Sequence, residues 1–336
     1  MTVADHGRDV FRHPGFARFW TAETVSDFGS YITTIALQVL MVLTLHGSAT
    51  DVGLLNASRW LPYLLLGLVV GALVDRRRRQ PILVVTDLSR GILLGVIPLL
   101  WLVGMLTLPI LLVFMVVFGI SSLLNDAASQ SFLPRLVPQS SLLAANARLD
   151  LSASVAQTSG PVVAGGLVTA LGAPVAVLVD AVSYLVSGAA IASIRTSENV
   201  TQPTGQPRNL RREISEGLRW VYRHRMLAPL AITTHARFLF NSMLVTVFVP
   251  FALLRLQLTA FELGVTLAAA GVGGLAGSLV STRAGLRWGA GRVVIACRAL
   301  MPLGWAIIAL VPASDNGRGH WFTIVLVGEP VSSLTD

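Results

Sequence analysis

The chain has 336 residues, of which 54% are hydrophobic and only 12% charged, with a mean hydropathy of +0.71. A soluble domain would carry about twice that fraction of charged residues. The apolar residues also come in runs of about 20, the length that a helix needs to cross a bilayer. This composition excludes a soluble enzyme and indicates an all-α, polytopic membrane protein. The net charge of +8 lies in loops beside these runs, which favours membrane lipid over nucleic acid as the charged partner.

The distribution of arginine predicts the orientation of the chain. All 25 basic residues are arginines, a usage typical of a GC-rich bacterial genome. With a cytoplasmic N-terminus, 19 of them fall in predicted inside segments, and two, Arg255 and Arg318, fall outside. No signal peptide is recognisable, and the single cysteine, Cys297, excludes an internal disulfide. We therefore expect a multi-pass protein of the bacterial inner (plasma) membrane.

The apolar runs predict ten membrane-spanning helices. In chain order they cover residues 17–45, 52–74, 82–104, 108–125, 149–171, 173–194, 227–254, 261–281, 293–312 and 320–336. The gap after the sixth run is rich in Thr, Pro, Gln and Asn and is followed at 209–225 by an amphipathic helical pattern. We expect a six-helix bundle at 1–194, a cytoplasmic linker at 195–226 and an incomplete bundle of about four helices at 227–336.

The two halves of the chain contain a weakly preserved internal repeat. Residues 264–292 align with residues 53–81 without gaps, and this alignment places Arg287 on Arg76. The second copy has lost its acid, because no Asp or Glu occurs between Glu262 and Asp315. Two parallel repeats joined by a basic linker are typical of one large class of transporters.

The charged link between the second and third runs carries the clearest motif. Its arginines alone would anchor a membrane segment by the positive-inside rule. The whole pattern, however, resembles the signature loop between helices 2 and 3 of the major facilitator superfamily. The positions in register are Gly71, Leu73, Asp75, Arg76, Arg79 and Leu83. The sequence departs from the family pattern at Arg78, where a glycine is usual, and at Gln80, where a second base is usual.

Further stretches resemble the exporter branch of that superfamily, which includes enterobactin exporters and macrolide-efflux proteins. They are the loop at 133–146, the sixth helix at 180–187 and the linker helix at 212–224. In the fifth helix, Gly160-Pro161-Val-Val-Ala-Gly165 resembles an element of drug/proton antiporters, with an alanine replacing one glycine. An ordinary kink with close helix packing would explain the same residues equally well.

The resemblance implies a two-bundle fold with twelve spans. Because this sequence stops in or just after the tenth, we expect a fragment or a truncated gene product. The resemblance also implies a cytoplasmic gate in which Asp75, Arg79 and Asp126 form a charge cluster beside Gly71 and Arg76.

Polar residues enter the membrane along one face of the first predicted helix. They recur at steps of three or four, which places them on one side of the helix and predicts the wall of a cavity. They are Trp20, Glu23, Asp27, Tyr31, Thr34 and Gln38. The seventh helix, its partner in the repeat, offers a similar set: His235, Phe238, Asn241, Ser242 and Thr246. We predict that the two sets line a substrate cavity.

Four intramembrane acids are candidate proton carriers. A charge at the centre of a span costs about 2.5–3.5 kcal/mol, so it usually faces a cavity or a partner. Asp27 is the main candidate, and Glu23 is either functional or an interfacial acid. Asp180 and Glu329 are further candidates, with a structural role left open for Asp180. For Arg59 we expect a structural ion pair.

The sequence indicates a transporter without a cofactor. It contains no zinc-protease motif and no phosphate-binding loop, which argues against metal catalysis and against ATP-driven transport. We expect a monomeric secondary exporter that expels a small amphipathic molecule in exchange for protons. Two alternatives stay open, namely a siderophore or metabolite exporter of the same fold and a truncated membrane protein that does not transport.

Overall fold

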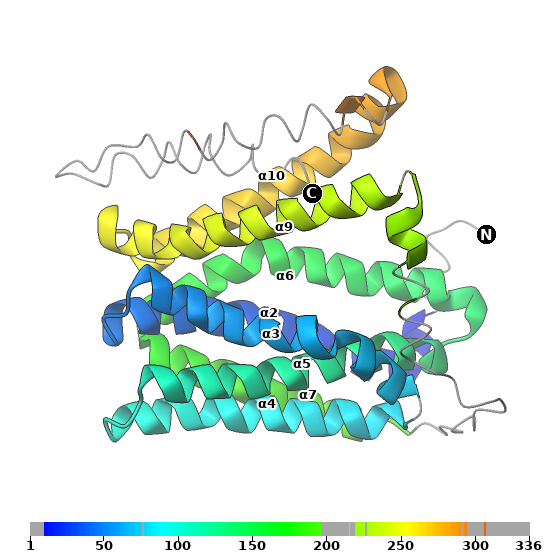
Figure 1. Ribbon diagram of the computed structural model, residues 1–336. Helices are drawn as coiled ribbons and strands as arrows, with labels where there is room; N and C mark the ends of the chain where they lie inside the picture. Colours follow the sequence, from blue (N-terminus) through cyan, green and yellow to red (C-terminus); the bar gives the residue numbers. More distant parts are fainter. Residues whose placement is uncertain are drawn as a thin grey trace.

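The computed structural model describes residues 10–75, 77–195, 219–225 and 227–289, together with 215, 292, 293 and 306. This part of the chain is built from long helices, which lie side by side with their axes roughly parallel (Figure 1). The all-α fold predicted from composition is confirmed. The six long helices of the first half are α2 (Pro14–Val39), α3 (Ala49–Asp75), α4 (Arg79–Leu102), α5 (Leu108–Leu136), α6 (Leu142–Leu171) and α7 (Ala173–Ala192).

The second half contributes two long helices, α9 (Leu227–Pro250) and α10 (Ala260–Trp288). Both lie on one side of the first six helices, where α9 packs against α3 and α10 packs along α6 (Figure 1). Within the first half, α2 packs between α6 and α7, α4 packs against α7, and α3 packs against α5. Short 3-10 turns precede α2 (η1, Val10–Arg12) and α6 (η3, Gln139–Ser141).

The predicted spans agree with the helices except around the fourth and fifth and at the end of the eighth, which was expected at residue 281 although α10 continues to Trp288. The fourth was expected to end at residue 125, yet α5 continues to Leu136. It does so because Ala128, Phe132 and Leu133 stay on its buried face, where the ring of Phe132 meets that of Phe19 at a centroid distance of 5.6 Å. The helix α6 likewise begins before the predicted residue 149, and the loop between the two helices is only residues 137–141.

The predicted ninth and tenth spans lie almost wholly outside the described residues. Of the predicted linker helix the structure describes 215 and 219–225, and residues 219–223 are helical. The predicted domain boundaries therefore stay predictions.

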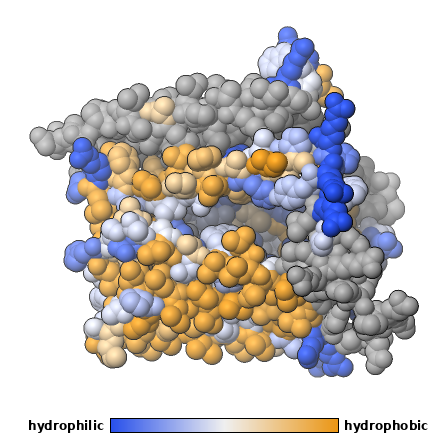
Figure 2. All heavy atoms as spheres, in the orientation of Figure 1, coloured by the Kyte–Doolittle hydropathy of each residue, from blue (hydrophilic) through white to orange (hydrophobic). Residues whose placement is uncertain are grey.

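Several helices have the length and apolarity needed to cross a membrane. Among the described residues five do so, namely Pro14–Thr44, Arg79–Leu102, Leu108–Leu136, Ala173–Ala192 and Leu227–Arg255. On α4, Val85, Ile92 and Leu99 are 65%, 62% and 62% exposed. Their seven-residue spacing puts them on one face, which would be unfavourable in water and is suited to lipid. Figure 2 shows a broad hydrophobic surface on the helices of the first half. The chain is a multi-pass membrane protein.

The internal repeat extends to unusual details of the backbone. The helix α2 ends in a π-helical turn, η2 (Leu40–Thr44), and α9 ends in another, η4 (Phe251–Arg255). Each turn is followed by a non-glycine residue with positive φ, His46 at 52° and Gln257 at 56°. Such residues are uncommon. Both turns and both residues precede the ranges aligned in the sequence, 53–81 and 264–292, but the same offset, continued toward the N-terminus, pairs them with each other.

Two apolar clusters show how the halves meet. One lies at the η2 and η4 end, and it mixes first-half residues such as Leu40 and Leu94 with Phe248 and Leu253 of the second half. The other lies at the opposite end, which carries the loop at 75–79, and its described members all come from residues 10–194. The described halves are thus sealed together by apolar packing at the η2/η4 end. We call the opposite end the loop end.

Candidate functional site

A cavity of about 900 Å³ lies between α2 and α3 of the first half and α9 of the second. Figure 2 shows less hydrophobic residues in the recess between the apolar surface of the lower helices and α9. The lining residues are Asp27, Ser30, Tyr31, Thr34 and Gln38 from α2, Asn56, Arg59, Trp60 and Leu64 from α3, and Phe238, Leu239, Asn241, Ser242, Val245 and Thr246 from α9. Polar and aromatic groups thus face one space from three helices.

The polar stripe on α2 divides between two environments. Asp27, Tyr31, Thr34 and Gln38 line the cavity, whereas Trp20 and Glu23 are not among its lining residues. The Trp20 indole Nε1 donates to Ser152 Oγ on α6 at 2.8 Å. Glu23 Oε1 accepts a hydrogen bond from Ser129 Oγ on α5 at 3.1 Å. The two acids one turn apart therefore face different neighbours.

The α9 set divides in the same way. Phe238, Asn241, Ser242 and Thr246 line the cavity, together with residues that the sequence reading did not select. His235 is exposed, and its Nδ1 lies 3.4 Å from the hydroxyl of Tyr222. It is not among the lining residues.

The contribution of α3 was missed. Arg59 was expected to form a structural ion pair; among the described residues it makes none within salt-bridge distance, and the expectation stays a prediction. Its Nη1 donates to Thr34 Oγ1 at 2.8 Å instead. Asn56 Nδ2 donates to Thr246 Oγ1 at 3.4 Å, a hydrogen bond between the two halves. An arginine and an asparagine inside an apolar run were the available signal.

A second polar cluster, which the sequence reading also missed, is buried inside the first half. Arg90 pairs with Asp87 one turn earlier on α4, and both side chains are almost fully buried. Asn125 Nδ2 on α5 donates to Asp87 Oδ1 at 3.1 Å, and Ser187 Oγ on α7 donates to Asp87 Oδ2 at 2.8 Å. An acid and a base three residues apart in an apolar run could have revealed this pair.

The buried cluster reaches the cavity through Tyr184. The Arg90 guanidinium lies 4.3 Å from the centroid of the Tyr184 ring. The Tyr184 hydroxyl is 2.9 Å from the hydroxyl of Ser30, which lines the cavity. Asp180, one turn earlier on α7, is fully buried and accepts a hydrogen bond from Ser183 Oγ at 2.8 Å. Asp180 lies against Gly29 of α2, where a larger residue would collide with its carboxylate.

The loop end carries the predicted gate. Arg79 is buried at the start of α4, and Asp126 Oδ2 accepts a hydrogen bond from the Tyr63 hydroxyl at 2.6 Å. The side chain of Asp75 and the whole of Arg76 lie outside the described residues. The predicted cluster of Asp75, Arg79 and Asp126 therefore stays a prediction. Glu329 also lies outside the described residues.

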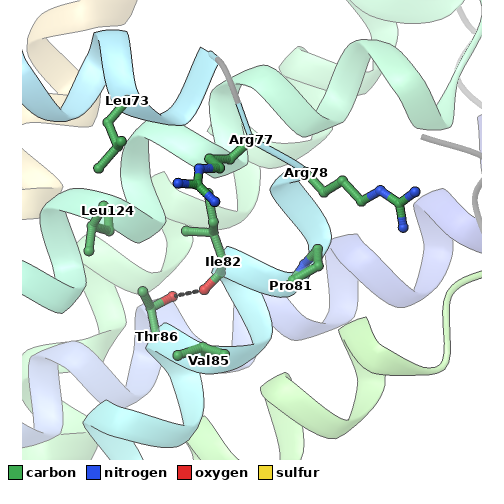
Figure 3. A pocket seen from close by; sticks show the side chains of 8 residues that line it. All are labelled: Leu73, Arg77, Arg78, Pro81, Ile82, Val85, Thr86 and Leu124. Carbon is green, nitrogen blue, oxygen red and sulfur yellow. Dashed lines mark hydrogen bonds between the residues drawn. The ribbon is translucent and has the colours of Figure 1, made fainter. Parts of the chain in front are cut away.

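A surface pocket of about 600 Å³ lies beside this loop. Figure 3 shows Arg77 reaching across it toward Leu73 and Leu124, while Arg78 points away. A Cβ added to Gly71 would meet nothing within 4 Å. The motif glycine is therefore not required here by close packing in the arrangement that the structure shows.

The glycines of α6, the fifth predicted span, allow this helix to pack closely against α2 of the first half and α10 of the second. A Cβ added to Gly160 would come within 2.8 Å of the Tyr31 ring on α2. A Cβ on Gly165 would collide with the carbonyl of Ala260 on α10, and one on Gly264 would collide with the carbonyl of Pro161. These contacts make the element a close helix crossing between the halves. An antiporter role for it stays a prediction.

Within the described part of the chain, no group of three or more His, Cys, Asp and Glu side chains could hold a metal ion. The recognisable chemistry of the cavity is thus a carboxylate, a guanidinium, amides, hydroxyls and aromatic rings.

Comparison with known sequences places the chain among transporters. The profile of a family described as "Transmembrane secretion effector" matches residues 9–328. The multidrug efflux pump Tap of Mycobacterium tuberculosis is 28% identical over 235 residues, which cover 67% of this chain and 55% of Tap. Macrolide efflux protein A of Streptococcus pyogenes is 25% identical over 211 residues, which cover 60% of this chain and 50% of that protein. The chain thus spans about half the length of these relatives.

Solved structures with the same fold are also transporters. The nucleoside transporter NupG superposes with a TM-score of 0.71 at 10% identity, over 96% of this chain and 80% of NupG. A bacterial homolog of the lysosomal transporter Spinster, in an inward-facing and unoccupied conformation, gives a TM-score of 0.66 at 18% identity, over 96% of this chain and 74% of that one. The fold is that of major facilitator transporters, which are not enzymes.

Proposed function

We propose that this chain, which belongs to the transmembrane secretion effector family of the major facilitator superfamily, is the core of a secondary exporter of small amphipathic molecules driven by proton antiport. The observation that carries this proposal is the polar and aromatic cavity between the halves, with Asp27 on its wall. The efflux functions named for Tap and macrolide efflux protein A support drug-like molecules as substrates.

The apolar seal at the η2/η4 end supports alternating access. With that end closed by Leu40, Phe248 and Leu253, a molecule would reach the cavity from the loop end. The arginine distribution favours a cytoplasmic loop end. The structure would then correspond to the state that loads substrate from the cytoplasm, and the opposite state would require the seal to separate.

Asp27 is the residue that we propose couples protons to this movement. A charged carboxylate is costly when a site closes away from water. A proton arriving from outside would neutralise Asp27 and let the halves close around an empty cavity. Release of that proton toward the cytoplasm would restore the charge and, with it, attraction for a cationic group on the next substrate molecule.

The test is efflux by the full gene product that contains this chain, measured in inverted vesicles over a series of imposed pH gradients. Asp27→Asn should abolish uphill efflux while expression and membrane insertion remain. Asp150→Asn is the matched control, because Asp150 is exposed on α6 and is not among the lining residues. Gradient-dependent efflux at the wild-type rate by Asp27→Asn would remove Asp27 from the mechanism.

The choice of compounds separates the alternatives. A panel of cationic drugs and a panel of siderophores or other metabolites distinguish a drug exporter from a metabolite exporter. Absence of transport with both panels, for a protein that folds and inserts, would favour a membrane protein that does not transport.

A further inference from the structure

Arg59 is a cation on the wall of the cavity, and within the described part of the chain no acid lies within salt-bridge distance of it, although its charge acts on the buried carboxylate of Asp180. Its Nη1 donates to Thr34 Oγ1 at 2.8 Å, and among the described residues it makes no ion pair. The guanidinium carbon lies 5.4 Å from the ring centroid of Phe118 and 5.9 Å from that of Trp60. The aromatic rings and the Thr34 hydroxyl thus hold the group in one place without a direct ion pair.

Within the described part of the chain, most of the hydrogen-bonding capacity of this guanidinium is unused. A guanidinium carries five N–H donors in a planar fork that matches a carboxylate. The hydrogen bond to Thr34 is the one that Arg59 makes within the described part of the chain. Since Arg59 lines the cavity, the remaining donors are available to a molecule bound there.

The cavity therefore has two poles of opposite charge. Asp27 precedes Thr34, the residue that Arg59 binds, by two helical turns on α2. The charges of Asp27 and Arg59 therefore lie about 10 Å apart along the axis of α2. Tyr31 of α2, Trp60 of α3 and Phe238 of α9 also line this space. A molecule with an apolar or aromatic body, a cationic group at one end and an acidic group at the other would satisfy both poles.

We propose that Arg59 binds an anionic group of the transported molecule, so that the cavity favours amphoteric compounds over compounds that are only cationic. This rests on the proposed function of the cavity as a substrate site. The competing explanation is that Arg59 only balances the charge of Asp27. A balancing charge would act on every cationic ligand alike, whereas a binding residue distinguishes ligands by their acidic group.

A pair of dyes isolates that acidic group. Rhodamine 110 carries a free carboxyl group, and its methyl ester, rhodamine 123, has the same cationic ring system without that acid. Binding of both to the purified full gene product in lipid nanodiscs is measured by fluorescence anisotropy. We expect roughly tenfold tighter binding of rhodamine 110, the scale of one charge-assisted hydrogen-bonded contact.

Variants of Arg59 test whether this residue causes the preference for rhodamine 110 over its methyl ester. Arg59→Gln should weaken the binding of rhodamine 110 to the level of the ester and leave the ester little changed. Arg255→Gln is the matched control, since Arg255 is exposed in η4 and is not among the lining residues. Arg59→Lys keeps the charge without the fork and should retain part of the preference. It provides the comparison if Arg59→Gln does not fold.

The outcomes separate this inference from the proposed function. Binding of neither dye to the wild-type protein would count against the cavity as a drug site. Binding of both dyes with no preference for rhodamine 110, or a preference that survives unchanged in the Arg59 variants, would overturn the Arg59 assignment and leave the cavity function standing.

Discussion

At the scale of single residues, the buried ion pair of Asp87 and Arg90 depends on several neighbouring side chains of the first half. Its ions are 1% and 5% exposed. A buried ion pair is tolerable only when further hydrogen bonds satisfy both groups. Asn125 and Ser187 supply such bonds to Asp87, and the Tyr184 ring covers Arg90. Side chains from α4, α5 and α7 therefore depend on one another at this point.

Removal of one partner should be far worse than removal of both. Asp87→Ala leaves the Arg90 charge buried without its acid, and we expect a loss of about 3–5 kcal/mol in the free energy of unfolding. Asp87→Ala combined with Arg90→Met should recover a large part of that loss. Thermal unfolding of the purified single and double variants in detergent measures the stability of each relative to the wild-type protein. Equal destabilisation by the single and the double variant would show that the pair does not act as a unit.

At the scale of elements, the starts of α3 and α10 are capped in the same manner. Ser48 N and Oγ donate to Asp51 Oδ2 at 2.7 and 2.8 Å, and Thr259 N and Oγ1 donate to Glu262 Oε2 at 2.8 and 3.0 Å. Each is a capping box, in which an acid at the third helical position satisfies groups that precede the helix. The offset of the repeat alignment, continued toward the N-terminus, pairs the two boxes, so both copies begin this helix in the same way.

The capping box at the start of α3 should lose its stabilising effect at acidic pH. Hydrogen bonds from the backbone N–H and the hydroxyl of Ser48 lower the pKa of Asp51 below its usual value. Because these bonds favour the charged carboxylate, their stabilising effect is complete above the ordinary pKa of Asp, about 4. It is lost as the pH falls through the lower pKa of the folded state.

Amide hydrogen exchange in the first turn of α3 reports this loss. In the wild-type protein, the protection of the amides in that turn against exchange should decrease as the pH is lowered below about 4. Asp51→Asn should show weaker protection at neutral pH and no further loss in this range. An identical acid response in Asp51→Asn would mean that another group controls the start of α3.

At the scale of the whole molecule, contacts at the η2/η4 end decide which side of the cavity is closed. Asn56 bonds to Thr246 across the halves, and a Cβ added to Gly53 would lie 3.6 Å from Thr246 Cγ2, an ordinary contact. The glycine crossing of α6 and α10 joins the halves as well. Together these contacts hold one end shut while the described residues at the loop end pack within the first half.

A disulfide across this contact should trap the closed end. With Cys297 replaced by serine, Gly53→Cys and Thr246→Cys should cross-link under mild oxidation and stop efflux, and a reductant should restore it. The pair Gly67→Cys and Thr246→Cys is the control, since a Cβ on Gly67 meets nothing within 4 Å. A complete cross-link with unimpaired efflux would show that this end does not open during transport.

The sequence predicted much of this architecture because its signals act within one helix. Runs of apolar residues identified the spans, and the spacing of Asp27, Tyr31, Thr34 and Gln38 identified a shared face. The extension of α5 escaped prediction because the apolar run ends at residue 125 and the resemblance indicated a loop from residue 133, while Phe132 packs against Phe19 inside the continued helix.

What the sequence alone determined is thus the class of the protein, the order of its helices, its repeat and the polar stripe on α2. Only the tertiary structure decided which neighbour each part of that stripe meets. Glu23 faces Ser129, whereas Asp27 faces the cavity, because helical spacing fixes a side chain's direction around its own axis and leaves the neighbouring helix unspecified. For the same reason Arg59 became a cavity residue, held by Thr34, only when α2 and α3 packed together.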